Sequence, residues 1–342
     1  MSAAPVRFNT TLVYVIALAL AAGVVLAALG VGRFPISIGE VLSLIGGKLF
    51  VPSPGTPSTA QIVLFDIRGP RVIAAFVVGG ALAAAGAAYQ NLFRNPLVSP
   101  DILGVSGGAA LGAVLGIFFA LPMLAIQGLA FAGGLLAVAA IYLIGQRIKG
   151  PDPMMTLVLT GVVTGSLFGA GVALTKYLAD PYNQLPAMTY WLLGSFAGVT
   201  KGDLAVVIPL MLASLAPLWL LRWRINLLSL PDDEARALGL NIQPLRLTVI
   251  VAATLMTAAG VAICGMVGWV GLVVPHAVRL LVGAEFSRLL PLAVLLGGTF
   301  MVVVDTIGRS IAQIEVPPGV LTAAIGTPIF IWLMHITYRR QP

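Results

Sequence analysis

The segment RNPLVSPDILGVSGGAALG (Arg94–Gly112) interrupts a chain that otherwise consists largely of Leu, Ala, Val and Gly. Two prolines within five residues prevent an incoming helix from continuing. Beyond the turn, glycine recurs at every fourth position from Gly104 to Gly116, which places it on one face of a helix. The same spacing recurs from Gly161 to Gly169. Because helices in lipid associate through small residues, these patterns predict closely packed helices in a membrane, joined by a tight turn.

The composition supports a membrane protein. Of 342 residues, 59% are hydrophobic and 9% are charged, against about 25% charged in a soluble domain. A helix needs about 20 mostly apolar residues to cross the hydrocarbon core. The charge-poor stretches predict an all-α fold of ten transmembrane helices, with residues 1–342 forming a single domain. These stretches are Phe8–Gly32, Val72–Phe93, Ile102–Gln146 with a turn at Pro122, Pro153–Thr175, Leu204–Leu221, Leu247–Gly283 with a break between Gly265 and Gly271, Leu289–Val304, and Val316–Tyr338.

The distribution of Lys and Arg predicts the orientation, because loops on the cytoplasmic side are enriched in both. With both termini inside, the cytoplasmic side receives Arg7, Arg94, Arg147, Lys149, Arg222, Arg224, Arg236, Arg246, Arg279, Arg288, Arg339 and Arg340. The opposite side receives only Arg33, Lys48, Arg68, Arg71, Lys176, Lys201 and Arg309. The net charge of +7 therefore reflects topology and anionic lipid, and no basic patch with interleaved aromatic residues predicts a nucleic-acid partner.

Residues that could carry chemistry are scarce. The sequence has no phosphate-binding loop, and Asp305 is the only acidic residue near the middle of an apolar stretch. The single cysteine, Cys264, and the two separated histidines form no metal-binding motif. Ion-coupled transport and intramembrane catalysis usually need ionisable residues within the spans. We therefore expect no catalytic residue, metal or cofactor in this chain, and an energy source on another polypeptide.

A polar segment, residues 222–246, could provide the contact with such a polypeptide. Within it, Pro231 and three acidic residues are typical of a helix start, and Gly239 is typical of a helix end. A helix of about two turns is unstable alone in water, so it must pack on something. An ordinary connector between two spans is the alternative interpretation.

Eight motifs, in order from residue 67 onward, resemble the FecCD-type permeases, the membrane subunits of ATP-driven importers for iron chelates, haem and vitamin B12. They are IRGPR (Ile67–Arg71), GGALAAAGAAYQNLFRNPLVSPDILGVSGGA (Gly79–Ala109), WLLGS (Trp191–Ser195), DDEARALGL (Asp232–Leu240), GLVVPHAVR (Gly271–Arg279), LLPLAVLLGG (Leu289–Gly298), VDTIGR (Val304–Arg309) and EVPPGVLTAAIGTPIF (Glu315–Phe330). The family fold of ten helices with both termini inside agrees with the helix count.

The resemblance implies two contact sites on the surface. Arg68, Arg71 and Arg309 would receive acidic residues of a periplasmic binding protein, a role that suits the bidentate guanidinium group. Snorkelling at the membrane interface is the alternative. The helix starting at Asp232 would be the coupling helix that enters a cleft on the ATPase. Its residues are Asp232, Asp233, Glu234, Ala235, Arg236, Ala237, Leu238 and Gly239.

The resemblance also implies a translocation pathway. The turn with Asn95 and Pro96 would form part of the cytoplasmic gate, together with Met154 and Met155 at the start of the fifth helix. Ordinary lipid or core contact is an equally good interpretation of the two methionines. The fifth helix, with Thr160 and Thr164, and the segment before Trp191 would line the route.

The expected assembly contains two copies of this chain, two ATPase subunits that hold ATP and Mg, and one binding protein, in the bacterial inner membrane. The segment that ends at Ser195 resembles the ferric siderophore branch most closely. Haem, cobalamin, and molybdate or tungstate stay open as substrates, as does an assembly of two different permeases. An ion-coupled secondary transporter and an intramembrane enzyme are the alternatives of other classes.

Overall fold

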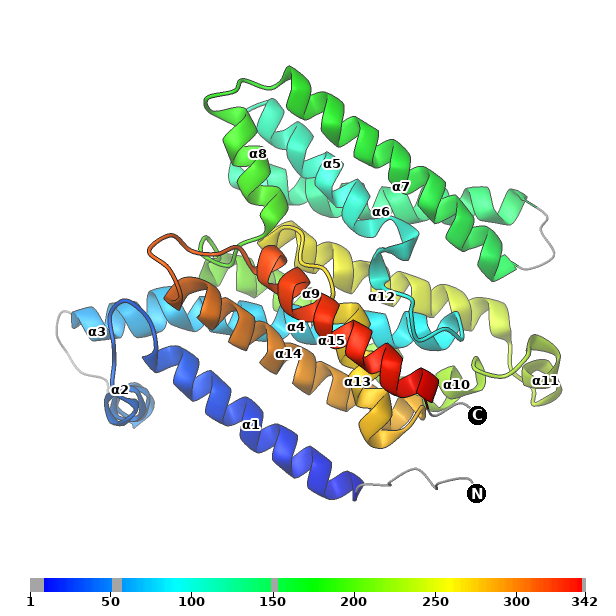
Figure 1. The fold of residues 1–342 in the computed structure, drawn as a ribbon, viewed down its shortest axis with the longest axis horizontal. Coiled ribbons are helices and arrows are strands. Elements are labelled where there is room, and N and C mark those ends of the chain that lie inside the picture. Colours follow the sequence, from blue (N-terminus) through cyan, green and yellow to red (C-terminus); the bar gives the residue numbers. More distant parts are fainter. Residues whose placement is uncertain (1–8, 51–56, 149–152, 340–342) are drawn as a thin grey trace.

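The computed structural model describes residues 9–50, 57–148 and 153–339, and these form helices joined by turns and loops, without strands (Figure 1). The elements are α1 Thr10–Gly30, α2 Ile38–Phe50, α3 Thr59–Ile62, the π-helical turn η1 Val63–Arg68, α4 Gly69–Leu92, the 3-10 turn η2 Pro100–Leu103, α5 Val105–Phe118, α6 Met123–Arg147, α7 Pro153–Leu178, α8 Gln184–Leu193, α9 Lys201–Leu220, α10 Arg222–Leu227, α11 Asp232–Ala237, α12 Ile242–Cys264, α13 Val270–Val282, α14 Phe286–Ser310 and α15 Pro318–Arg339.

Eight of the described helices are long and apolar enough to cross a membrane, where the sequence predicted ten. The two predicted helices that fall short are α5, with 14 residues, and α13, with 13 residues. Both predicted breaks are confirmed. Pro122 directly precedes α6, and the chain leaves the helical conformation between Cys264 and Val270.

The helix α4 forms the centre of the molecule and is buried along most of its length by α12, α13 and α14. Small residues make this possible. A Cβ on Gly86 would lie 1.8 Å from the carbonyl oxygen of Gly271, so α4 and α13 touch backbone to backbone. The short helix α13 is thereby held directly against the central helix.

A second layer consists of α5, α6 and α7, which lie together on one side of the central helices (Figure 1). The glycine pattern of α5 packs as predicted, because a Cβ on Gly108 or Gly112 would lie within 2.4 Å of a backbone oxygen of α6. On α7 the prediction is confirmed for Gly161 only. A Cβ on Gly165 or Gly169 would meet no atom of the described chain within 4 Å.

The bundle has two distinct ends. The first turn of α1 and the last turn of α15 lie at the same end as α10 and α11, which we call the α11 end (Figure 1). The helices α2, α3 and α8 lie at the opposite end, the α8 end. The arrangement agrees with termini on one side, and Arg7, Lys149 and Arg340 of that prediction lie outside the described residues.

Candidate functional sites

A buried ion cluster lies at the α8 end. Arg71 of α4 donates from Nε to both carboxylate oxygens of Asp305 at 3.0 Å. Its two terminal nitrogens donate to the two oxygens of Glu315 at 3.0 and 2.9 Å. Asp305 is 1% exposed, so its charge depends on these contacts and on Arg309, whose Nε lies 3.8 Å away. The cluster ties α4 to α14 and to the loop before α15.

Two further arginines cap the C-terminal end of α1. Arg68 donates from Nη1 to the carbonyl oxygens of Leu29 and Gly30 at 2.8 and 3.0 Å. Arg309 donates to the carbonyl oxygens of Val31, at 2.7 Å, and Ala28. The last carbonyls of a helix have no partner within it and carry partial negative charge. The two guanidinium groups therefore serve as the C-terminal cap of α1.

The docking arginines are thus not presented to a partner as the sequence analysis expected. Arg68, Arg71 and Arg309 are 5%, 8% and 7% exposed and are engaged within the chain. Carbonyls at the end of α1 engage Arg68 and Arg309, whereas two carboxylates engage Arg71. Glu315, outside the spans, is the most accessible acid of the cluster, and the hydrogen bonds from Arg71 lower its pKa. Direct docking through these arginines stays a prediction that would require such contacts to be exchanged.

At the α11 end, the last residues of α4 and the turn after it contact four different elements. The hydroxyl of Tyr89 lies 3.2 Å from a threonine hydroxyl of α12, and the amide of Gln90 donates to a carbonyl of α13 at 3.1 Å. The amide of Asn91 donates to a carbonyl of α10 at 2.6 Å, and Arg94 forms a 2.7 Å salt bridge to α11. The end of α4 therefore connects α10 and α11 to the core.

The turn that was predicted to form part of the cytoplasmic gate comes directly after α4. Asn95 is exposed, and its side-chain oxygen accepts a hydrogen bond from the backbone N–H of Leu97 at 2.9 Å. Pro96 is half-buried. The exposed loop at this end of the bundle is compatible with the predicted gate role, which stays a prediction.

The predicted coupling helix is present as α11, with Gly239 in the left-handed conformation at φ 80° just after it. It has an inner and an outer face. Ala235 is 1% exposed, and Asp232 bonds to Arg94 and Arg246. The outer face consists of Asp233, Glu234, Arg236, Ala237, Leu238 and Gly239, all exposed. This face is free to contact a partner at the α11 end.

On α7, the predicted pathway residues Thr160 and Thr164 are four residues apart and therefore lie on one face of the helix, and they differ in exposure. Thr160 is 8% exposed and donates to the carbonyl of Thr156 in its own helix at 2.8 Å. Thr160 is therefore covered within the chain, and the expectation that it lines a pathway stays a prediction. Thr164 is half-buried and bonds to the carbonyl of Thr160 at 2.7 Å. Met154 is half-buried, whereas Met155 is 61% exposed.

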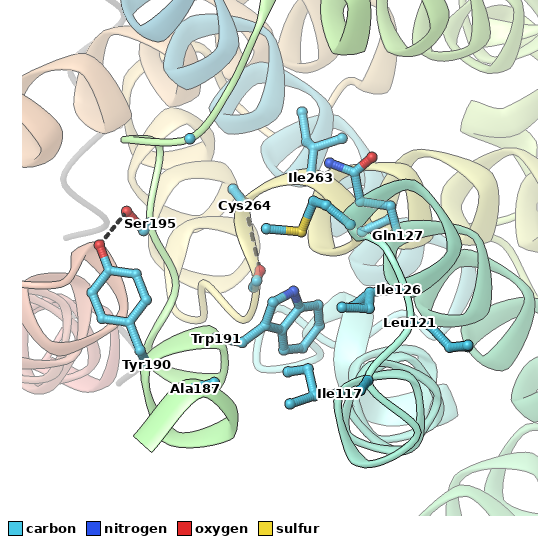
Figure 2. Close-up of a pocket in the computed structure, with 15 residues that line it drawn as sticks. Ile117, Leu121, Ile126, Gln127, Ala187, Tyr190, Trp191, Ser195, Ile263 and Cys264 are labelled. Atoms are coloured by element: carbon cyan, nitrogen blue, oxygen red, sulfur yellow. Dashed lines mark hydrogen bonds between the residues drawn. The ribbon is translucent and has the colours of Figure 1, made fainter. Parts of the chain in front are cut away.

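Trp191 lies in a cavity of about 400 Å³ at the α8 end. Figure 2 shows its ring between Ile117 and Ile126 on one side and the end of α12 at Cys264 on the other. The cavity is mostly apolar, and Gln127 contributes a polar group to its lining. Trp191 thus points toward α5 and α6.

The comparisons with known proteins decide the family. The model of the FecCD transport family matches residues 18–335. The chain belongs to the FecCD transport family. The eight motifs from Ile67 to Phe330 fall within the matched range.

The names of similar proteins give different cargoes. The molybdate import system permease protein of Haemophilus influenzae is 38% identical over 309 residues, 90% of each chain. The Fe(3+) dicitrate transport system permease protein of Escherichia coli is 41% identical over 278 residues, 80% of this chain and 85% of that protein. A solved inward-facing metal-chelate type ABC transporter superposes with a TM-score of 0.85 at 36% identity, covering 95% of this chain and 99% of that chain. This FecCD chain is therefore a multi-pass permease of the ABC importer type.

The sequence analysis missed charged partners in two of these sites. It considered Asp305 only as an isolated acid and did not consider Glu315, although both hold Arg71. It also missed Arg246, which shares the carboxylate of Asp232. Charged residues in mostly apolar sequence usually pair with one another or with backbone carbonyls, and that rule was the available signal.

Proposed function

We propose that this chain is the translocation subunit of an ABC importer that carries an iron chelate, with a ferric siderophore as the favoured cargo. Two copies would enclose the pathway in the bacterial inner membrane. Two ATPase subunits, which hold ATP and Mg, would bind the α11 end, and a periplasmic binding protein would deliver cargo at the α8 end. The family match across residues 18–335 carries this proposal.

The proposed topology has ten crossings with both termini in the cytoplasm. The short helices α5 and α13 would count as crossings, because each is preceded by residues that are themselves held within the protein. Leu103 before α5 is 1% exposed and Val267 before α13 is 7% exposed. Irregular backbone at membrane depth is tolerated where protein surrounds it. The α11 end would face the cytoplasm, in agreement with the excess of Lys and Arg predicted for that side.

The outer face of α11 supports the proposed ATPase contact. A six-residue helix with an anchored inner face and an exposed outer face has the shape of a docking element. The turn at Asn95 and Pro96, with Met154 and Met155 at the start of α7, would close the pathway at this end. Such a permease needs no catalytic group, because the ATPase supplies the energy.

The exposed side of α7 favours a cargo with an organic surface. Between Pro153 and Thr175 the sequence has no charged residue. Val163, Leu167 and Leu174 are 72%, 69% and 59% exposed. A small hydrated oxyanion gains little from such a surface, because leaving water without new hydrogen bonds is costly. A chelate that wraps iron in organic ligand can pass along it.

Molybdate is the second candidate, and the relative from Haemophilus influenzae favours it. The test uses the complete transporter in proteoliposomes, with ferrichrome, haemin, cyanocobalamin and molybdate offered one at a time. We expect ATP-dependent accumulation of ferrichrome. If only molybdate accumulated, molybdate and not an iron chelate would be the cargo. Accumulation of any probe without ATP would support an ion-coupled secondary transporter instead.

A further inference from the structure

The turn after α4 contains a residue that departs from a local rule. Helices commonly end on a residue in the left-handed conformation, and this residue is usually glycine because a Cβ is unfavourable there. Arg94 occupies the position with a φ of 51°. The backbone N–H groups of Arg94 and Asn95 close the helix end on the carbonyls of Asn91 and Gln90. Strained residues persist where the surroundings hold them, and glycine would lack the side chain that these surroundings bind.

That side chain reaches the first residue of α11. Nη2 of Arg94 donates to Oδ1 of Asp232 at 2.7 Å, and Nη2 of Arg246 donates to the same oxygen at 2.7 Å. The side chains of Arg94, Asp232 and Arg246 are 36%, 31% and 7% exposed. One carboxylate therefore joins the turn, α11 and the first turns of α12, with Arg246 as the buried anchor.

The charges make Asp232 necessary to this junction. Two guanidinium groups converge on one carboxylate, and without its charge they would repel each other. Hydrogen bonds between ionised groups are also about twice as strong as neutral ones. An uncharged residue at this position would free the turn from α12.

Asp232 also lies on the inner face of α11, opposite the surface that a partner could contact. The side chain of the next residue, Asp233, is 98% exposed, so the outer face of α11 is open to a partner. Asp232 and the buried Ala235 form the inner face. Movement of the outer face must therefore move the carboxylate that holds Arg94.

We propose that Asp232 is a positioning residue that couples movement of α11 to the turn at residues 94–99, which carries Asn95 and Pro96. The inference rests on the proposed function, in which α11 receives the force of the ATPase. As α11 moves, Asp232 shifts relative to Arg246 and carries Arg94 and the turn with it.

The test compares Asp232→Asn and Arg94→Gln in the complete transporter. Glu285→Gln is the matched control, because Glu285 is an acid between α13 and α14 whose ion pair with Arg288, at 2.8 Å, lies outside the coupling machinery. Spin labels on Leu97→Cys and Leu12→Cys, both at exposed positions, report the distance between the turn and α1. The distance is measured before and after nucleotide is trapped with vanadate. Cys264 is 2% exposed, so we expect no labelling of it in the folded protein.

In the wild type and in Glu285→Gln, trapping changes this distance. In Asp232→Asn and Arg94→Gln, nucleotide is still trapped but the distance does not change. Transport of the accumulated probe per ATP hydrolysed falls about tenfold, as expected for the loss of one charge-assisted hydrogen bond. The double variant falls no further than Asp232→Asn alone, because both substitutions break the contact between Arg94 and Asp232 and only Asp232→Asn also affects Arg246. Arg94→Lys restores part of the transport.

The proposal is overturned if Asp232→Asn keeps both the distance change and the transport ratio, or if the losses of the two single variants multiply in the double variant. If the wild-type complex itself traps no nucleotide, the proposed function is wrong, and this inference falls with it. The two failures are therefore distinguishable in one set of measurements.

Discussion

The contact between α4 and α13 makes a sharp prediction for Gly86→Ala. The new Cβ would lie 1.8 Å from the oxygen, 2.6 Å from the carbon and 2.8 Å from the Cα of Gly271, all of them backbone atoms. Real Cβ contacts hardly ever fall below 3.0 Å, so the two helices must separate by at least 3.0 − 1.8 = 1.2 Å along that line. Gly271 is itself tightly packed, because a Cβ on it would lie 2.6 Å from Pro100 and 2.8 Å from the carbonyl oxygen of Leu82 on α4.

Overpacking in a well-packed core costs about 1–3 kcal/mol, and a rigid backbone contact belongs at the upper end of that range. We expect Gly86→Ala to lower the apparent melting temperature of the detergent-purified subunit by about 5 °C. The control is Gly23→Ala on α1, where the new Cβ meets nothing within 4 Å and helix propensity improves. Equal melting temperatures for the two variants would refute the close approach of α4 and α13.

Three further predictions concern the ion cluster and α7. Asp305→Asn removes the buried counter-charge of Arg71 and Arg309, so it should destabilise the subunit by about 3–5 kcal/mol. The measurement is the loss of monodisperse protein on heating. Unchanged stability would contradict the charge balance of the cluster. Because Arg71 lowers the pKa of Glu315, the stabilisation is complete above the unfolded pKa of about 4.3 and is lost as pH falls through the lower folded value. The difference in melting temperature between wild type and Glu315→Gln should therefore be constant from neutral pH to about pH 5 and shrink below about pH 4; a difference that disappears near neutral pH would refute this assignment. Val163→Trp, on the exposed side of α7, should abolish probe transport without lowering the melting temperature, whereas Thr160→Val, on the buried side, should leave transport intact; the reverse pattern would assign the pathway to the other side of the helix.

The sequence was informative where the physics is local. Pro122 and Gly265 marked breaks between helices because proline and a left-handed glycine end helices by their own geometry. The acids after Pro231 and the glycine at 239 likewise marked α11 almost to the residue. Helix existence in a membrane follows from length and apolar content, which any single stretch reveals.

The sequence was less informative where distant segments meet. Arg68 and Arg309 were predicted at the surface, but carbonyls of α1 that lie 38 and 278 residues away in the chain occupy them. Spacing identified one face of α7 with Gly161, Gly165 and Gly169, yet only the first of these packs within the chain. Periodicity defines faces, and only the fold decides which face is covered.

The central claim is that this chain is a passive conduit whose movement is driven through α11. The most direct measurement replaces residues 232–239 with a flexible Gly/Ser linker of equal length and follows probe accumulation and ATP hydrolysis in proteoliposomes. The account predicts that accumulation is lost while the ATPase subunits still hydrolyse ATP. Accumulation at the wild-type rate would contradict it.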